Sequence, residues 1–254
     1  MLYLFLGRQE KLVLRYDFLS IFFTAMIGTL AIAFAVLNST GLLGKVEEVA
    51  AREERSFDLP VFSYDMDTRI KRVVVRNAGY DATIESTSTD EISVFGTYRV
   101  QTKKREKQLM NVDDYLMANQ IGDTLYIDLK MLPNDAGPFH TQGAAAVTIL
   151  IPNDVELEAA GENDSLTLKP RSLKNNWSVE MASAVTVHSS ESKNLKIDAK
   201  GVEELSGREW QVIKKEKEQN QNPSGEKDAL YQIGTGQYHI NIVSCYQVSL
   251  LTGE

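Results

Sequence analysis

Few residues in the sequence have the types and spacing that enzyme chemistry needs. The three histidines, His140, His188 and His239, are too far apart to suggest a shared metal site. The single cysteine, Cys245, excludes an intramolecular disulfide framework and a CxxC zinc site, and its place in an apolar strand predicts a buried, inert thiol. No GxSxG, HExxH, GxxxxGK[ST] or GxGxxG motif occurs. We therefore predict that the protein is not an enzyme and has no catalytic, cofactor-binding or metal-binding residue.

A group of acidic residues offers a weaker kind of chemistry. Glu156, Glu158, Glu162, Asp164 and Glu180 could form a weak cation site, but the calcium-binding repeat that such solenoid sites carry is absent. We interpret these residues as the solvated face of a sheet. In the same region Trp177 heads an apolar triplet, which favours a core position over sugar stacking; Trp210, beside a polar loop, leaves both interpretations open.

The charge balance limits the partners of the chain. Residues 41–254 hold 24 basic and 33 acidic residues, a formal charge of −9. This balance argues against a nucleic-acid partner, since phosphate binding needs clustered Lys and Arg. The basic run at 103–107 could contact anionic lipid or a wall polymer, but the excess of acid favours a solvated loop.

An uncharged stretch of 20 residues, 18–37, has the length of a bilayer-spanning helix. Its large apolar residues favour insertion by about 3 to 6 kcal/mol. The predicted anchor residues are Phe18, Leu19, Ile21, Phe22, Phe23, Ile27, Leu30, Ile32, Phe34, Val36 and Leu37. The alternative is a cleavable signal peptide, for which Ala33-Phe34-Ala35 resembles a cleavage site. The length of the apolar run favours an uncleaved anchor.

The anchor divides the chain into four predicted parts. Residues 1–17 form a short cytoplasmic tail that carries Arg8, Lys11 and Arg15, residues 18–37 span the bilayer, and residues 38–57 form a stalk. The Ala and Glu content of the stalk favours a helical continuation of the anchor. Residues 58–254 then form an extracytoplasmic domain. This predicts a single-pass membrane protein whose lipid partner contacts residues 18–37.

The outer part of the sequence changes from helical to alternating spacing. Between residues 155 and 197, apolar-polar-apolar triplets start 11, 11, 8 and 10 residues apart, with turn residues between them. Their predicted core residues are Val155, Leu157, Leu166, Leu168, Trp177, Val179, Val185, Val187, Leu195 and Ile197. Such short units bury their apolar side chains only when stacked, which favours a mainly β, parallel β-solenoid or β-helix-like repeat domain. A β-sandwich has similar strand spacing and remains the alternative. Polar stretches at 102–114 and 214–228 are predicted surface loops.

Several of these strands resemble a known family. Arg72 to Glu85 with Asp90 to Val94, Gly122 to Asp128, Val147 to Pro152 and Gly234 to Ile242 are similar to successive elements of the putative-adhesin β-strand-repeat family of bacterial envelope proteins. The resemblance covers about residues 60–252. It implies a repetitive β domain that is often tethered by one membrane helix, a link to envelope-stress systems, and no catalytic residues.

We therefore expect a membrane-anchored envelope protein whose β domain is a non-catalytic, adhesin-like interaction module, with an envelope protein or a surface polymer as its partner. A carbohydrate-active enzyme on a β-solenoid and a self-assembling structural spacer remain alternatives.

Overall fold

The computed structural model describes residues 2–41, 52–66, 69–77, 79–103, 110–132, 144–162, 164–213 and 225–252. The chain divides into two compact units, Met1–Glu53 and Glu54–Glu254. His140, residues 104–107 of the basic run and residues 214–224 of the second predicted loop lie outside the described residues.

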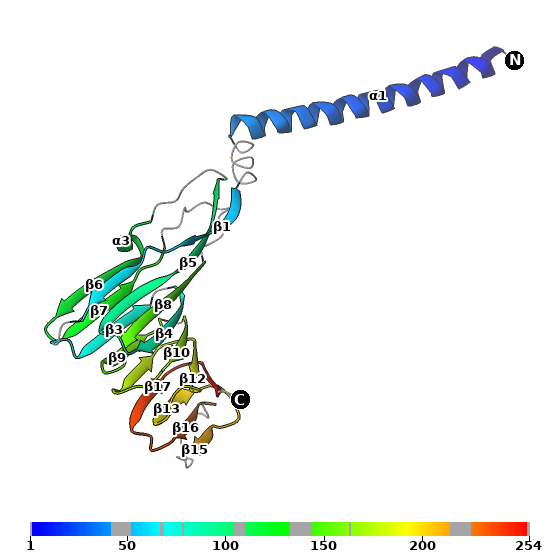
Figure 1. The fold of residues 1–254 in the computed structure, drawn as a ribbon. Helices are drawn as coiled ribbons and strands as arrows, with labels where there is room; N and C mark the ends of the chain where they lie inside the picture. The colour runs from blue at the N-terminus through cyan, green and yellow to red at the C-terminus, as the bar shows by residue number, and fades with distance from the viewer. Residues whose placement is uncertain are drawn as a thin grey trace. The chain divides into compact units, whose positions relative to one another are not determined.

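The first unit contains the helix α1 (Leu2–Ser39), drawn in blue in Figure 1. The helix begins well before residue 18, so the expected tail and the apolar stretch form one continuous helix. Within the apolar stretch, the Thr24 and Thr29 hydroxyls each donate to the carbonyl four residues earlier at 2.8 Å, which satisfies both groups inside the helix. The helix ends at Ser39, and Gly41 in the turn that follows has a φ of 69°, the left-handed conformation that glycine adopts readily after a helix.

The second unit is mainly β, and its strands form two mixed sheets of nine strands each. Sheet A contains β1 (Arg52–Asp58), β2 (Phe62–Asp65), β4 (Asp81–Thr87), β5 (Glu91–Lys103), β8 (Ala144–Pro152), β10 (Ser165–Lys169), β12 (Ala184–His188), β14 (Glu204–Ser206) and β18 (Gln247–Leu251). Sheet B contains β3 (Arg72–Asn77), β6 (Leu116–Ile121), β7 (Thr124–Leu129), β9 (Glu156–Ala160), β11 (Trp177–Glu180), β13 (Leu195–Val202), β15 (Gln211–Ile213), β16 (Lys227–Ile233) and β17 (Tyr238–Val243). A short helix, α3 (Val112–Tyr115), precedes β6.

Consecutive strands from β9 to β14 alternate between the two sheets. The strands of sheet B in this series start at residues 156, 177 and 195, so one strand of each sheet recurs about every 20 residues. Neighbouring strands in the middle of both sheets are parallel, whereas β5, β6 and β16 pair antiparallel near the ends. Antiparallel strands end the repeating part on both sides of sheet B and on one side of sheet A, whose other side ends at the parallel strand β14.

The order of strands in space differs from their order in the chain. The last pair, β17 and β18, lies between earlier pairs: β17 pairs with β11 and β13, and β18 pairs with β12 and β14. The same exchange occurs near the other end, where β3 lies between β7 and β9 and β4 lies between β8 and β10. At each end of the domain, strands that are far apart in the sequence therefore pair with one another.

One hydrophobic core contains inward-facing side chains from both sheets. The strands alternate between buried and accessible residues because successive side chains point to opposite faces. The ten residues that the triplets suggested as core all lie in this cluster, and each is at most 5% exposed.

Three local expectations differ from the structure. The predicted helical stalk includes the strand β1, which starts at Arg52 because its backbone pairs with β5, and that pairing overrides local helix propensity. The predicted loop at 102–114 includes the end of β5, which runs to Lys103, and the helix α3. Likewise, β16 begins at Lys227, inside the second predicted loop.

Candidate binding faces

The apolar side chains of α1 from Phe18 to Leu37 have no protein cover among the described residues. All eleven predicted anchor residues are exposed, from 39% for Leu37 to 73% for Phe18. The segment Phe18–Ser39 is long and apolar enough to cross a membrane, and a signal sequence has the same properties. So large an apolar surface in water is unfavourable.

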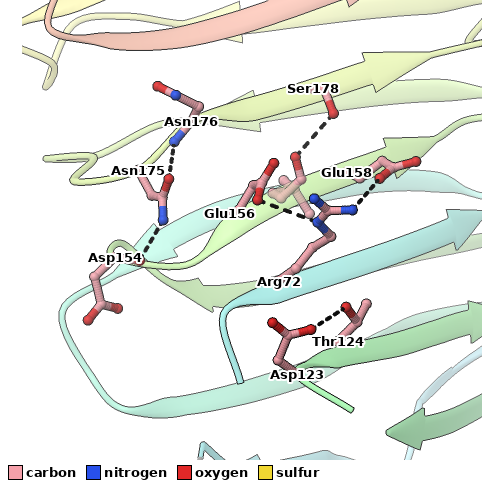
Figure 2. Close-up of polar contacts among 10 residues, drawn as sticks. Arg72, Asp123, Thr124, Asp154, Glu156, Glu158, Asn175, Asn176 and Ser178 are labelled. Carbon is pink, nitrogen blue, oxygen red and sulfur yellow. Dashed lines mark hydrogen bonds and ion pairs between the residues drawn. The ribbon is translucent and has the colours of Figure 1, made fainter. Parts of the chain in front are cut away.

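The outer face of sheet B carries paired charges (Figure 2). Arg72 on β3 lies between two carboxylates of β9, with its Nε 3.4 Å from Glu156 and a terminal nitrogen 3.9 Å from Glu158. Beside it, Arg76 donates to both carboxylate oxygens of Asp128, and this pairing raises the pKa of Arg76. Arg72 therefore neutralises Glu156 and Glu158, two of the acids that a cation site would need.

The other acidic residues considered above do not join them. Asp164 accepts a hydrogen bond from the Gly79 backbone N–H, Glu162 lies in the turn after β9, and Glu180 ends β11. Among the described residues, no group of three or more His, Cys, Asp or Glu side chains is placed to hold a metal ion.

The described histidines and the cysteine are not arranged as a catalytic set. His188 is half-buried at the end of β12, and His239 on β17 lies 4.0 Å from Asp198. Cys245 is 2% exposed, as predicted, but it lies in the turn between β17 and β18 rather than in a strand. Burial raises the pKa of the Cys245 thiol, which disfavours the reactive thiolate.

The two tryptophans both have structural contacts. Trp177 is 1% exposed in the core. Trp210 packs edge-on against Tyr231 and donates from Nε1 to the Ser206 carbonyl at 2.9 Å. Neither ring is free on a surface as a platform for sugar stacking.

The outer face of sheet A carries a line of hydroxyl groups, here called the hydroxyl row. From β8 to β14 its members are Thr148, Thr83, Thr167, Thr186, Ser249 and Ser206. Each member is paired in register with the next, so the row crosses six parallel strands without a gap. The five members other than the exposed Ser206 are half-buried, and their strand neighbours point into the core.

The hydroxyl row was not predicted, although part of its signal is visible in the sequence. Thr167 and Thr186 are the central residues of two of the triplets. The sequence does not show that these triplets align with Thr83, Thr148 and Ser249, because this alignment depends on strand pairing between distant segments.

A hollow of about 540 Å³ lies near the turn that holds Cys245. Glu203 and Glu226 both line it, together with Tyr246. The Tyr246 hydroxyl donates to Glu204 at 3.3 Å, and the charge of Glu204 raises the pKa of Tyr246. This places two carboxylates around one open hollow.

Comparison with known proteins gives little information on function. No protein-family profile matches the chain, and no curated protein matches it. Two solved structures are similar. A "putative cell adhesion protein" of Clostridium sporogenes aligns with 80% of this chain and 100% of its own, at 12% identity and a TM-score of 0.43. A "putative lipid binding protein" of Parabacteroides distasonis aligns with 54% of this chain and 52% of its own, at 14% identity and a TM-score of 0.24. At these TM-scores neither likeness supports an argument, and the resemblance to the adhesin family stays a prediction.

Proposed function

We propose that the chain is a membrane-anchored protein of the bacterial cell envelope and that its β domain is a non-catalytic binding module. The observation that carries the proposal is the uncovered apolar helix, because its mainly apolar segment of 22 residues matches the thickness of a bilayer. A lipid bilayer buries the apolar side chains of such a helix. In this proposal α1 is retained as an anchor, and the β domain lies on the extracytoplasmic side.

We further propose that the central strands form solenoid coils. The alternation of β9 to β14 between two sheets and the repeat of about 20 residues support this arrangement. A coil of this kind presents a regular outer face on each sheet. Such regular faces suit binding better than catalysis, which needs converging side chains.

The anchor is tested by replacing two exposed residues of the helix. Ile27→Arg/Leu30→Arg places two charges near the centre of the segment, at a cost of about 5 to 7 kcal/mol, which exceeds the insertion energy predicted from the sequence. The matched control is Met117→Arg/Ile121→Arg, which changes two exposed apolar residues of β6. We expect the helix variant to leave the carbonate-washed membrane fraction and the control to remain there.

The mass of the mature chain separates an anchor from a signal sequence. A chain that keeps residues 1–35 supports the anchor, and cleavage after Ala35 would overturn it.

The side of the membrane is tested by protease added to intact spheroplasts, which should digest the β domain. For the binding role, the full-length protein in detergent is incubated with envelope proteins and with cell-wall polymers. A failure to retain either class would overturn the binding module.

The hollow lined by Glu203 and Glu226 favours one second candidate, a glycoside hydrolase. Such enzymes use two carboxyl groups flanking one glycosidic bond. Release of reducing sugar from wall glycans by the full-length protein, abolished by Glu203→Gln and by Glu226→Gln, would support it. Equal release by the wild type and both variants would exclude this hollow as the active site.

A further inference from the structure

We propose that the hydroxyl row of sheet A binds a neutral, linear glycan that lies across the strands. This inference rests on the proposed binding function of the β domain and names its ligand class. Four features of the row support it: unused hydrogen-bonding capacity, regular spacing, flanking charges that are either paired or acidic, and an aromatic ring at one end.

The first feature is that the six hydroxyls have no hydrogen-bond partner among the described residues. Other hydroxyls of the domain do have one: Ser178 on sheet B donates to the Leu157 carbonyl at 3.3 Å, and Ser192 donates to the Pro170 carbonyl. Each free hydroxyl offers one donor and two acceptor positions. A ligand rich in groups that both donate and accept, as a glycan is, can use this capacity fully.

The second feature is the spacing of the row. Adjacent strands lie about 4.7 to 4.9 Å apart, so six in-register hydroxyls extend over roughly 24 Å. A linear polymer of similar units repeats its polar groups along one direction, as the row does. Several weak contacts to one chain then act together and strengthen binding.

The third feature is the charge beside the row: on one side the charges are paired with one another, and on the other side Asp81 and Glu204 are acids without an ion pair among the described residues. Glu85 lies 3.4 Å from the Lys169 Nζ and 2.7 Å from an Arg171 nitrogen, and Arg171 also lies 3.0 Å from Glu191. The row itself carries no charge, and residues 41–254 are acidic overall. An anionic polymer gains little here, so these charges favour a neutral ligand.

The fourth feature concerns access to the row. Phe95 on β5 is in register with Thr148 and 38% exposed, so its ring extends the row at one end and can pack against the apolar face of a sugar. On one side of the row three of the accessible side chains are small, those of Ala146, Ser165 and Ala184, and the larger Asp81, Gln247 and Glu204 lie on the same side. A polymer can therefore approach the hydroxyls from this side.

The test uses the full-length protein in detergent. The probes are cellohexaose and chitohexaose as neutral linear glycans and a hyaluronate hexamer as an anionic one. Binding is measured by calorimetry. The test variant is Thr167→Val/Thr186→Val, which removes two hydroxyls but keeps the shape and the β-branching of both side chains. The matched control is Thr124→Val/Ser178→Ala, which removes two hydroxyls from the outer face of sheet B.

We expect the wild type to bind at least one neutral hexamer and to bind hyaluronate at least 10-fold more weakly. The row variant should lose at least 10-fold in affinity, the control less than 2-fold, and Thr167→Ser/Thr186→Ser less than 3-fold. Circular dichroism and melting temperature show whether each variant folds. If the valine variant does not fold, the serine variant still tests the inference. It keeps both hydroxyls, so its binding must persist, and loss of binding would contradict the role of the hydroxyls.

Three results would overturn the inference: no binding of either neutral hexamer, equal loss in the row variant and the control, or a preference for hyaluronate. If the protein binds an envelope protein but neither glycan, the proposed function stands and the glycan assignment fails. Loss of all binding partners together with loss of membrane retention would instead reject the proposed function.

Discussion

Gly161 lies where two turns of the β domain stack on one another. A Cβ at this position would be 2.7 Å from the Ala182 Cβ and 2.9 Å from its Cα, which is closer than such atoms approach. We expect Gly161→Ala to lower the free energy of unfolding by about 1 to 3 kcal/mol. Adding Ala182→Gly should restore part of this loss, because one of the two contacts disappears. Gly225→Ala is the control, since a Cβ there has open space. Equal urea midpoints for Gly161→Ala and this control would contradict the close packing of the turns.

Tyr115 predicts how stability changes at high pH. Its ring is 0% exposed, its hydroxyl donates to the Pro60 carbonyl at 2.6 Å, and burial raises its pKa to about 12. An unfolded tyrosine titrates near pH 10. The folded state therefore holds the proton more tightly, and the stability contributed by this proton is complete below about pH 10 and falls between about pH 10 and 12. Tyr115→Phe should cost about 1 kcal/mol at pH 8 through the lost hydrogen bond. From pH 8 to pH 11 its urea midpoint should fall less than that of the wild type; identical falls would refute the assignment.

At the scale of the element, the repeat predicts which deletions the domain tolerates. Glu180 is in register with Ala160 one strand away, so deleting residues 161–180 removes β10 and β11 and rejoins the chain at an equivalent position. In the proposed solenoid each coil contacts only its neighbours, so we expect the shortened protein to fold and to melt cooperatively at a lower temperature. Deleting residues 165–176 removes β10 alone and forces every later strand into the other sheet. That protein should show no cooperative melting. The same melting behaviour in both deletions would mean that the coil is not the unit of the fold.

At the scale of the whole molecule, the sequence predicts the features that depend only on residues close together in the chain, such as strands, their buried faces and the apolar helix. The pattern Leu166-Thr-Leu168 identifies a strand and its buried face, because alternation is a local property. The apolar stretch of α1 was equally clear, although its start at Leu2 was missed because charged residues interrupt the pattern before residue 18. The sequence did not predict that β17 and β18 lie between β11 and β13 and between β12 and β14. Nothing in Tyr238 to Leu251 identifies those neighbours, and the hydroxyl row depends on the same distant pairings.

This placement predicts that the whole β domain depends on its last strand. β18 carries Val248 and Leu250, which are at most 5% exposed, and it pairs with β12 and β14. Burial of these two side chains contributes about 3 to 6 kcal/mol, a large share of the 5 to 15 kcal/mol that usually stabilises a domain. Removing β18 would also leave β14 without its one described partner strand. We therefore expect a chain that ends at Tyr246 to lose cooperative thermal unfolding and to be digested quickly by protease.

A chain that ends at Thr252 is the control, because it keeps all of β18. It should melt within about 3 °C of the full-length protein. In a repeat protein whose chain order matches its order in space, losing the final strand removes only a terminal unit and the remainder stays folded. If the chain ending at Tyr246 keeps a cooperative transition close to that of the control, β18 is an accessory strand and not an interior one. The loss of the transition would show instead that folding is completed only after the C-terminus has been made.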